Sequence, residues 1–139
     1  MGREWSARKV AVVGAGAVGS TFAYALAQSG VADEIVLIDR SDDLAKGQAL
    51  DLAHGLPFFP SVDIRAGGPA DYRDASAIVI AAGAKQQPGE SRLALLGRNV
   101  AMIKEAAGEI AAQDSPAVAV VASNPVDILT YTLQRELGW

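Results

Sequence analysis

The sequence predicts an α/β fold, a parallel sheet with helices packed on both of its faces. Two observations support this prediction. Short runs of consecutive apolar residues, as at 10–13 and 35–38, alternate with longer segments whose apolar residues recur at helical spacing. Strands that are apolar along their whole length are typical of a parallel sheet buried on both sides. The chain has 139 residues, a length that suits one domain.

The expected elements end where the local sequence disfavours their continuation. The alanine-rich first helix stops at Gly30, the second stops at Gly55, and the last begins after Pro125, in keeping with glycine after a helix and proline at its start. The charged residues 1–8 are interpreted as an N-terminal extension and 9–139 as a single domain. Strands are expected at 9–13, 34–38, 62–64, 76–82 and 117–121, and helices at 17–30, 42–54, 91–113 and 126–137.

Apolar residues at helical spacing support three of the helices. The first helix carries Phe22, Ala25 and Leu26, and the second carries Leu44, Leu50 and Leu52. On the longest helix the spacing predicts a face that packs in the core. That face is expected to consist of Leu95, Leu96, Val100, Ile103 and Ile110.

The composition excludes several classes of protein. The net charge of −4 argues against a nucleic-acid-binding surface, which is usually basic. With no Cys and one His, disulfides, thiolate sites and a Cys nucleophile are excluded, and no metal site is expected. No apolar run reaches the ~18 residues of a membrane span, and the charged N-terminus does not have the pattern of a signal peptide. We therefore expect a cytoplasmic protein with neither nucleic-acid nor membrane partners.

A glycine motif lies between the first expected strand and the first expected helix. The segment GAGAVG, residues 14–19, fits G-x-G-x-x-G in the context that dinucleotide binding requires. Gly14 permits a tight turn, Gly16 lets the backbone approach a pyrophosphate, and Gly19 lets helix and strand pack closely. The free N–H groups at the start of the helix favour phosphate there.

An acidic residue completes the motif. Asp39 follows the second strand, 20 residues after Gly19, where a carboxylate accepts hydrogen bonds from a ribose diol. Because this carboxylate would repel a 2′-phosphate, NAD is favoured over NADP, although the adjacent Arg40 is of a type that can hold such a phosphate. The alternative is an ordinary glycine turn with a surface Asp. The four features in register predict a doubly wound Rossmann domain with NAD as its cofactor.

Further blocks of sequence carry a resemblance to a known family. They follow the glycine motif and Asp39 in order, and those near 82–92 and 123–127 are more specific than the glycine motif. Over essentially its whole length, the chain resembles the N-terminal, NAD-binding half of the lactate/malate dehydrogenase family. The blocks are DLAHG at 51–55, AGA at 82–84, QQPGESR at 86–92 and SNPVD at 123–127.

The resemblance implies roles for individual residues. Arg92 would polarise the substrate carbonyl, because a cation aimed at developing negative charge stabilises the transition state; without the resemblance it is a surface residue of a helix. Asn124 would hydrogen-bond the substrate oxygen, or it belongs only to the turn before Pro125. Asp127 is expected to cap or orient the start of the last helix, and a contact with substrate is its weaker alternative. The cofactor would be contacted by Gly14, Gly16, Val18, Gly19, Asp39, Gly83, Ala84, Ala122, Ser123 and Asn124.

Gln86 occupies the loop position that discriminates substrates in the family it resembles. Malate enzymes carry Arg there, and the neutral Gln86 cannot pair with a second carboxylate. Glu90 favours the same interpretation, because an acidic residue near the pocket disfavours a dicarboxylate, whereas Lys85 would partly restore positive charge. The resemblance therefore implies an NAD-dependent L-lactate dehydrogenase acting on pyruvate. The alternative for the enzyme is a malate or other 2-hydroxy-acid dehydrogenase of the family. The alternative for the loop is an ordinary solvated connection with no role in substrate choice.

His54 is the one imidazole that could serve as a base. The resemblance places it in the block at 51–55, at the end of a helix. We expect it to cap that helix or to contact another subunit rather than to act in catalysis.

The resemblance also indicates what the chain lacks. The family's second half supplies the His that exchanges a proton with the substrate, its Asp partner, and an Arg that binds the substrate carboxylate. We expect the sixth strand and the catalytic domain to lie outside this sequence and the fifth strand to be an exposed edge. We expect the isolated chain to be inactive and the parent enzyme to be a homo-oligomer, a dimer or tetramer. A stand-alone nucleotide-binding module is the non-catalytic alternative.

Overall fold

The computed structural model describes residues 8–139. The expected N-terminal extension over 1–8 therefore lies outside the described residues except for Arg8. Arg8 is exposed, and its guanidinium lies 2.8 Å from a carboxylate oxygen of Asp33. Its hydrogen bonds to that carboxylate lower the pKa of Asp33 to about 2.

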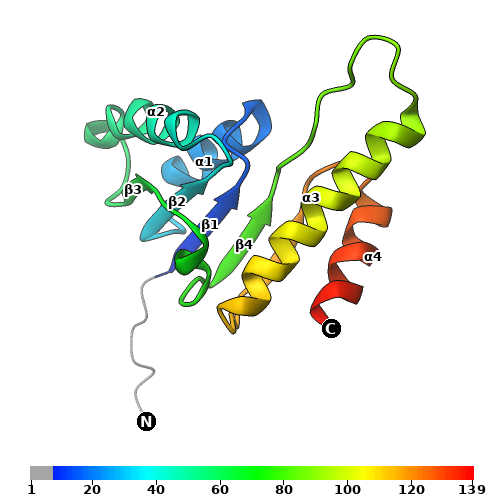
Figure 1. Ribbon diagram of the computed structural model, residues 1–139. Coiled ribbons are helices and arrows are strands. Elements are labelled where there is room, and N and C mark those ends of the chain that lie inside the picture. Colours follow the sequence, from blue (N-terminus) through cyan, green and yellow to red (C-terminus); the bar gives the residue numbers. More distant parts are fainter. Residues whose placement is uncertain (1–7) are drawn as a thin grey trace.

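A parallel sheet forms the centre of the structure, as predicted (Figure 1). Within residues 8–139 it has five strands in the order β3-β2-β1-β4-β5. The first strand is central, and Val10 lies opposite Ile35 on one side and Ala77 on the other. The strands are β1 (Lys9–Val13), β2 (Glu34–Ile38), β3 (Asp63–Ala66), β4 (Ala77–Ile80) and β5 (Val118–Val121).

Helices cover both faces of this sheet. One apolar cluster joins alternate strand residues such as Val12 and Ile35 to α1 (Ala17–Ser29) and α2 (Asp42–Ala53). The other joins strand residues such as Ala11 and Ile78 to α3 (Arg92–Ala112) and α4 (Val126–Leu137). Two short 3-10 helices, η1 (Leu56–Phe58) and η2 (Pro69–Tyr72), complete the fold. None of the helices in 8–139 combines the length and apolarity needed to cross a membrane.

The helices on the α1 and α2 side pack through small residues. In α1 the buried positions are Gly19, Ala23 and Ala27, whereas Phe22 and Ala25 are exposed. In α2 the buried positions are Ala45, Ala49 and Leu52, and Leu44 and Leu50 are exposed. Of the large apolar residues predicted for these helices, Leu52 is buried and Leu26 packs against the core. Most of the packed face is nevertheless alanine, which lets a helix approach a sheet closely. On α3 the expected core residues Ile103 and Ile110 are buried.

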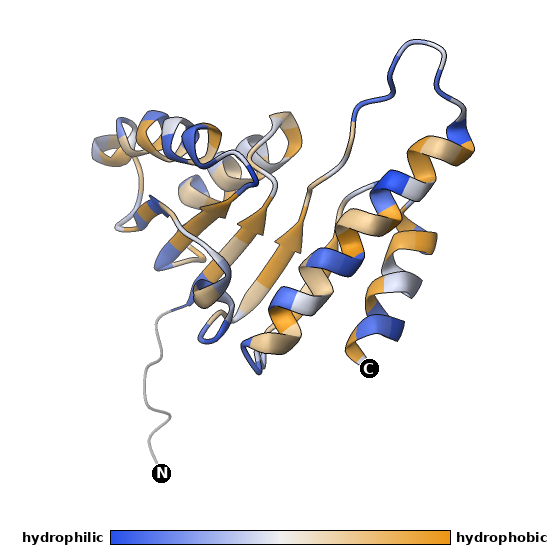
Figure 2. Ribbon diagram, in the orientation of Figure 1, coloured by the Kyte–Doolittle hydropathy of each residue, from blue (hydrophilic) through white to orange (hydrophobic). Residues whose placement is uncertain are grey.

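Figure 2 shows how apolar and polar residues are distributed over the fold. The central strands are coloured as apolar, and the loop between β4 and α3 is largely hydrophilic. At the sheet's edge β5 pairs with β4, and the Val118 side chain there is 68% exposed. This agrees with the expected exposed edge strand.

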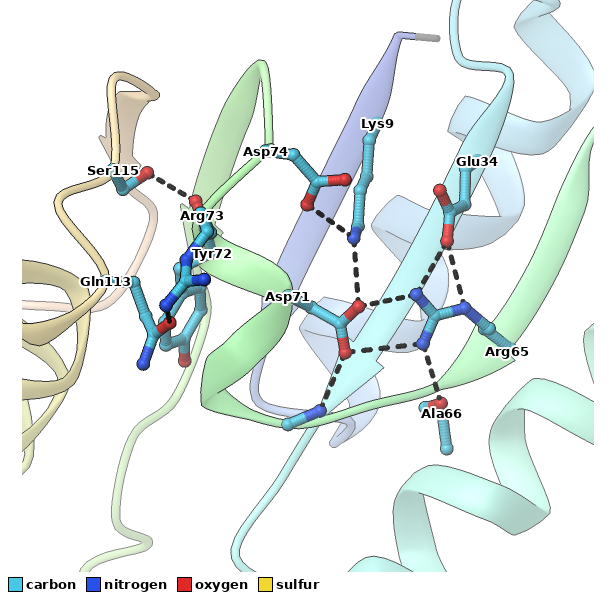
Figure 3. Close-up of polar contacts among 11 residues, drawn as sticks. Lys9, Glu34, Arg65, Ala66, Asp71, Tyr72, Arg73, Asp74, Gln113 and Ser115 are labelled. Carbon is cyan, nitrogen blue, oxygen red and sulfur yellow. Dashed lines mark hydrogen bonds and ion pairs between the residues drawn. The ribbon is translucent and has the colours of Figure 1, made fainter.

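A network of charged side chains joins the amino-terminal part of the sheet to η2 (Figure 3). Lys9 Nζ is nearly inaccessible to solvent and lies 2.9 Å from Asp71 Oδ1 and 2.8 Å from Asp74 Oδ1. Arg65 also binds Asp71, and its Nε donates to Glu34 over 2.9 Å. The Arg65 hydrogen bonds are the main reason that the pKa of Asp71 lies well below its usual range.

Asp71 also fixes the backbone that leads into η2. Its Oδ2 accepts a hydrogen bond from the N–H of Gly68 over 3.0 Å. A Cβ at Gly67 would lie 2.2 Å from the same oxygen, so Gly67 permits the close approach of the carboxylate to this turn. The network therefore sets the path of the chain between β3 and β4.

Replacing Asp71 with Asn should lower the free energy of unfolding at pH 7 by about 2 kcal/mol, because Lys9 and Arg65 lose a charged partner. The pKa of Asp71 is depressed in the folded state, so its carboxylate stabilises the fold above the unfolded pKa near 4. That stabilisation is lost as the pH falls below about 4. The difference between wild type and variant should therefore shrink between pH 5 and pH 3, measured by urea unfolding.

The matched control for this prediction is Asp74→Asn. Asp74 binds the same Lys9 ammonium, but its own side chain is 71% exposed. Its replacement should cost less than about 1 kcal/mol. Equal losses for the two variants, or a loss at Asp71 that does not change with pH, would contradict the assignment.

Candidate functional site

A cleft opens at the carboxyl ends of the central strands. It has a volume of about 360 Å³, and residues that follow β1, β2 and β4 line it, among them Gly14, Asp39 and Ala82. Since β2 and β4 lie on opposite sides of β1, the chain leaves β1 and its neighbours in opposite directions at this point. Open α/β sheets bind ligands at such a switch of direction.

The glycines at 14 and 19 allow the first strand and first helix to pack closely. Gly14 has φ +96°, and a Cβ there would lie 2.6 Å from the backbone nitrogen of Ala82. A Cβ at Gly19 would lie 1.8 Å from the carbonyl oxygen of Gly14. Both positions therefore require glycine for the fold itself.

Gly16 has a different surrounding. It lines the cleft and precedes α1 as its N-cap residue, with φ −72°. A Cβ at Gly16 would meet no atom within 4 Å. The fold therefore does not require glycine at this position. Because Gly16 has no side chain, the space beside the first turn of α1 is open. The backbone N–H groups of that turn have no partner within the helix.

Asp39 connects the end of β2 to the glycine turn. Its Oδ2 accepts a hydrogen bond from the N–H of Ala15 over 2.8 Å, and its Oδ1 accepts one from Ser41 over 2.9 Å. Each carboxylate oxygen has a second lone pair, so the residue that positions the turn can also accept from a diol in the cleft.

The cleft is acidic. Four carboxylates line it, and Arg40 is its single basic residue among those described. Arg40 Nη2 lies 2.6 Å from Glu105 Oε2, so this cation is already paired. Burial is the main cause that raises the pKa of Glu109, with a further contribution from Glu105. The four carboxylates belong to Asp39, Asp42, Glu105 and Glu109.

These features fit the adenosine and pyrophosphate part of a dinucleotide. The cleft offers apolar side chains for a base at Ile38, Met102 and Ala106, and a carboxylate for a ribose diol at Asp39. The N-terminus of α1 offers free N–H groups and the positive end of its dipole for a pyrophosphate. The acidity of the cleft disfavours an additional 2′-phosphate. No group of three or more potential metal ligands occurs in the described part of the chain.

Two of the predicted substrate residues, Gln86 and Arg92, lie in or at the end of the loop between β4 and α3. Figure 1 shows this loop standing clear of the sheet and the helices. Gln86 is exposed and donates from Nε2 to the Glu90 carbonyl over 2.8 Å. Arg92 is the exposed first residue of α3. Neither residue lines the cleft beside Asp39, so the structure does not bring the two groups together.

Glu90 is bound at the base of this loop. Its carboxylate accepts hydrogen bonds from Arg98 Nε over 2.7 Å and from the Gln87 N–H over 2.9 Å. The Arg98 hydrogen bonds lower the pKa of Glu90. The expectation that Glu90 repels a dicarboxylate is therefore not supported by its surroundings, because Arg98 neutralises its charge.

The loop after β5 carries the other predicted residues. Ser123 is buried, and its hydroxyl donates to the carbonyls of Ile80 and Ala82 at the end of β4. The N–H of Ala122 also donates to Ile80, over 2.9 Å. Asn124 is exposed and precedes Pro125 through a cis peptide bond. Pro125 occupies the N-cap position of α4, so the prediction that Asp127 caps this helix is wrong. Asp127 lies in the first turn, where a carboxylate interacts favourably with the helix dipole.

The remaining predicted residues are spread around the cleft. Gly83 lines it, and Ala84 lines a second hollow together with Arg40 and Arg98. Val18 is exposed in the first turn of α1. His54 is the exposed C-cap residue of α2, and its N–H donates to the Leu50 carbonyl, in agreement with a capping position rather than a place in the cleft.

Asn99 is a connecting residue that the sequence analysis missed. It is 6% exposed, its Oδ1 accepts from the Ala84 N–H over 2.9 Å, and its Nδ2 donates to the Asn124 carbonyl over 3.3 Å. It thereby joins the loops that follow β4 and β5. A polar residue four positions before the buried Ile103 was the available signal, because it interrupts an apolar helix face.

The fold and the cleft define a dinucleotide-binding domain of the kind found in dehydrogenases. Residues 8–138 match the family model of the lactate/malate dehydrogenase NAD-binding domain. The chain belongs to the lactate/malate dehydrogenase family and forms its NAD-binding domain, so its cofactor is NAD.

Individual relatives agree with this assignment. The chain is 58% identical to an L-lactate dehydrogenase of Treponema denticola over 95% of its own length and 42% of the relative's. It superposes with a TM-score of 0.94 on the ligand-bound minor L-lactate dehydrogenase of Enterococcus mundtii at 40% identity, over 97% of this chain and 43% of that one. For a malate dehydrogenase of Picrophilus torridus the TM-score is 0.90 at 34% identity, over 95% and 43%. The chain thus spans about two fifths of these relatives' length.

The different surroundings of Gly16 and Gly19 predict different effects of substitution. Gly16→Val should reduce NADH binding at least tenfold, because the side chain fills the space beside the α1 N-terminus, while costing at most about 1 kcal/mol of stability. Gly19→Ala should destabilise the fold by about 2–3 kcal/mol through overpacking. Calorimetric titration with NADH and urea unfolding measure the two effects.

Gly47→Ala is the control for this pair of variants. Gly47 lies within α2, and a Cβ there meets no atom within 4 Å. This variant should keep its NADH affinity and lose no stability, because alanine in a helix interior is about 0.5–1 kcal/mol more favourable than glycine. Unchanged NADH binding by a folded Gly16→Val variant would refute the assigned role of Gly16.

Proposed function

We propose that this chain is the NAD-binding part of an NAD-dependent L-lactate dehydrogenase, which interconverts pyruvate and L-lactate. The observation that carries the proposal is the 58% identity to the L-lactate dehydrogenase of Treponema denticola over 95% of the chain. Bound NAD(H) supplies the hydride acceptor or donor. The chain's own residues bind and orient this cofactor and one side of the substrate.

The cleft supports part of the proposed set of cofactor contacts, since Gly14, Gly16, Asp39 and Gly83 line it. Asp39 accepts hydrogen bonds from the adenosine ribose, and the N–H groups that follow Gly16 bind the pyrophosphate. The turns after β4 and β5, tied to each other by Asn99 and Ser123, would support the nicotinamide end. The residues proposed to contact NAD are Gly14, Gly16, Val18, Gly19, Asp39, Gly83, Ala84, Ala122, Ser123 and Asn124.

The proposed catalytic residue in this chain is Arg92, which would stabilise the negative charge that develops on the substrate oxygen. Asn124 would donate a hydrogen bond to the same oxygen, and Asp127 at the start of α4 is a weaker candidate for substrate contact. Because Gln86 and Arg92 lie outside the cleft, these roles require the loop between β4 and α3 to fold toward the carboxyl edge of the sheet. Contacts of Glu90 with Gln86 and Gln87 hold the loop together, whereas the contacts of Arg98 in α3 with Glu90 and Lys85 would have to change in such a movement.

The proposed preference for pyruvate rests on Gln86. A neutral amide cannot form an ion pair with the second carboxylate of oxaloacetate. Glu90 does not add to this preference, since Arg98 neutralises it, and Lys85 is exposed beside Gln86. A malate or other 2-hydroxy-acid dehydrogenase is the second candidate, favoured by the structural match to the malate dehydrogenase of Picrophilus torridus.

We further propose that the groups needed to complete catalysis come from the part of the enzyme that corresponds to the rest of its relatives. These groups are a His that exchanges the substrate proton, its Asp partner and an Arg for the substrate carboxylate. The whole enzyme is proposed to be a cytoplasmic homo-oligomer. A stand-alone nucleotide-binding module would need none of these groups.

A chimera tests the proposed activity. Residues 8–138 would replace the corresponding part of the Treponema denticola L-lactate dehydrogenase, which also serves as the positive control. We expect pyruvate-dependent oxidation of NADH by the chimera and none by the isolated 139-residue chain. Turnover by the isolated chain would contradict the proposed division of the catalytic groups. A folded chimera that binds NADH without reducing pyruvate would instead favour the binding module.

In the same chimera, Gln86→Arg should shift the ratio of kcat/KM for oxaloacetate over pyruvate by at least tenfold toward oxaloacetate, because the guanidinium can pair with the second carboxylate. Gln87→Arg, one position along the loop, is the matched control and should leave the ratio near that of the unmodified chimera. An unmodified chimera that already prefers oxaloacetate would overturn the assignment of Gln86.

A further inference from the structure

The structure explains why Arg40 need not recruit a phosphorylated cofactor. Arg40 directly follows Asp39, the residue placed for a ribose diol, so a 2′-phosphate on that ribose would fall within its reach. An arginine near this position is the usual means of holding the 2′-phosphate of NADP. By residue type alone, Asp39 therefore favours NAD and Arg40 favours NADP.

Glu105 is the residue whose contact with Arg40 bears on the choice between NAD and NADP. It projects from the middle of α3, 65 residues away in sequence, and its Oε2 lies 2.6 Å from Arg40 Nη2. Both residues line the cleft. The ion pair therefore connects the wall formed by the β2–α2 turn to the wall formed by α3.

The charges around this pair reinforce its effect. Asp39, Asp42 and Glu109 also line the cleft, and the pair itself has no net charge, so the other ionisable carboxyl groups of the lining are not balanced by a further basic residue within residues 8–139. A 2′-phosphate bound to Arg40 would have to share the guanidinium with Glu105 Oε2 and would be repelled by the Glu105 carboxylate. The uncharged 2′-hydroxyl of NAD meets neither obstacle.

We propose that Glu105 is a specificity-determining residue that favours NAD over NADP by holding the Arg40 guanidinium. It acts through Arg40 and is therefore a positioning residue, while Asp39 contacts the ribose. The proposal rests on the NAD site of the chain and is independent of the substrate proposed above. Its distinguishing property is that it changes the choice between two cofactors without changing the affinity for NADH.

Calorimetric titration of the 139-residue chain with NADH and with NADPH tests this proposal. We expect Glu105→Gln to lower the Kd for NADPH about fivefold, the order expected for removing one charge from a solvent-exposed ion pair, with the Kd for NADH within about twofold of wild type. The matched control is Glu136→Gln, which removes the partner of Lys104 on the same helix pair, 3.3 Å away. It should leave both Kd values unchanged.

The double variant Arg40→Gln with Glu105→Gln separates release of Arg40 from simple loss of negative charge. The gain in NADPH affinity should disappear in the double variant. An equal gain with and without Arg40, or no gain in Glu105→Gln, would overturn the proposal. A wild-type chain that binds NADPH as tightly as NADH would also overturn it. Failure of the wild type to bind NADH would instead refute the cofactor site itself.

Discussion

The close contact between the first helix and the first strand is the constraint on which the rest of the site depends. The carbonyl oxygen of Gly14 lies where a Cβ of residue 19 would be, so α1 can reach this position only with glycine at 19. The contact directs the N-terminus of α1 toward the carboxyl edge of the sheet. Asp39 then holds the turn by accepting from Ala15. Packing and ligand geometry are set by the same few atoms.

Different groups support the two ends of the site. At the adenosine end, Asp71 and its cationic partners shape the turn at Gly67 and Gly68, two residues that line the cleft. At the other end, Asn99 joins the turns that follow β4 and β5. The central strands need no such polar support because they are buried on both faces. Hydrophobic packing therefore builds the sheet, and specific polar contacts position the loops that follow it.

The sheet and helices could be predicted from the sequence because they depend on local patterns. Continuous apolar runs, glycine stops and the motif at 14–19 are contiguous along the chain, and all nine expected strands and helices are present with ends shifted by at most a few residues. The packed faces of α1 and α2 were less predictable. Alanine carries little hydrophobic signal, and Gly19, Ala23 and Ala27 were buried while the larger Phe22 stayed exposed.

The polar contacts around the site could not be predicted in this way. Arg40 and Glu105 are 65 residues apart, and Lys9 and Asp71 are 62 apart, so their pairing follows only from the folded topology. The pairing of Glu90 with Arg98 is closer in sequence, at eight residues, but it too depends on how the loop folds against α3. The residue types near a motif show which ligands they could bind. Whether a charged side chain is free to bind a ligand depends on its partners in the folded structure.

The central claim is that Asp39 and the glycine turn form the NAD site of this chain. Calorimetric titration of NADH into the wild-type chain and an Asp39→Asn variant, whose folding is checked by circular dichroism, tests it most directly. The account predicts that the wild type binds NADH with one site and that the folded variant binds at least tenfold more weakly, because the amide accepts the ribose hydrogen bonds less well than the carboxylate. Equal affinity of the two folded proteins for NADH would contradict it.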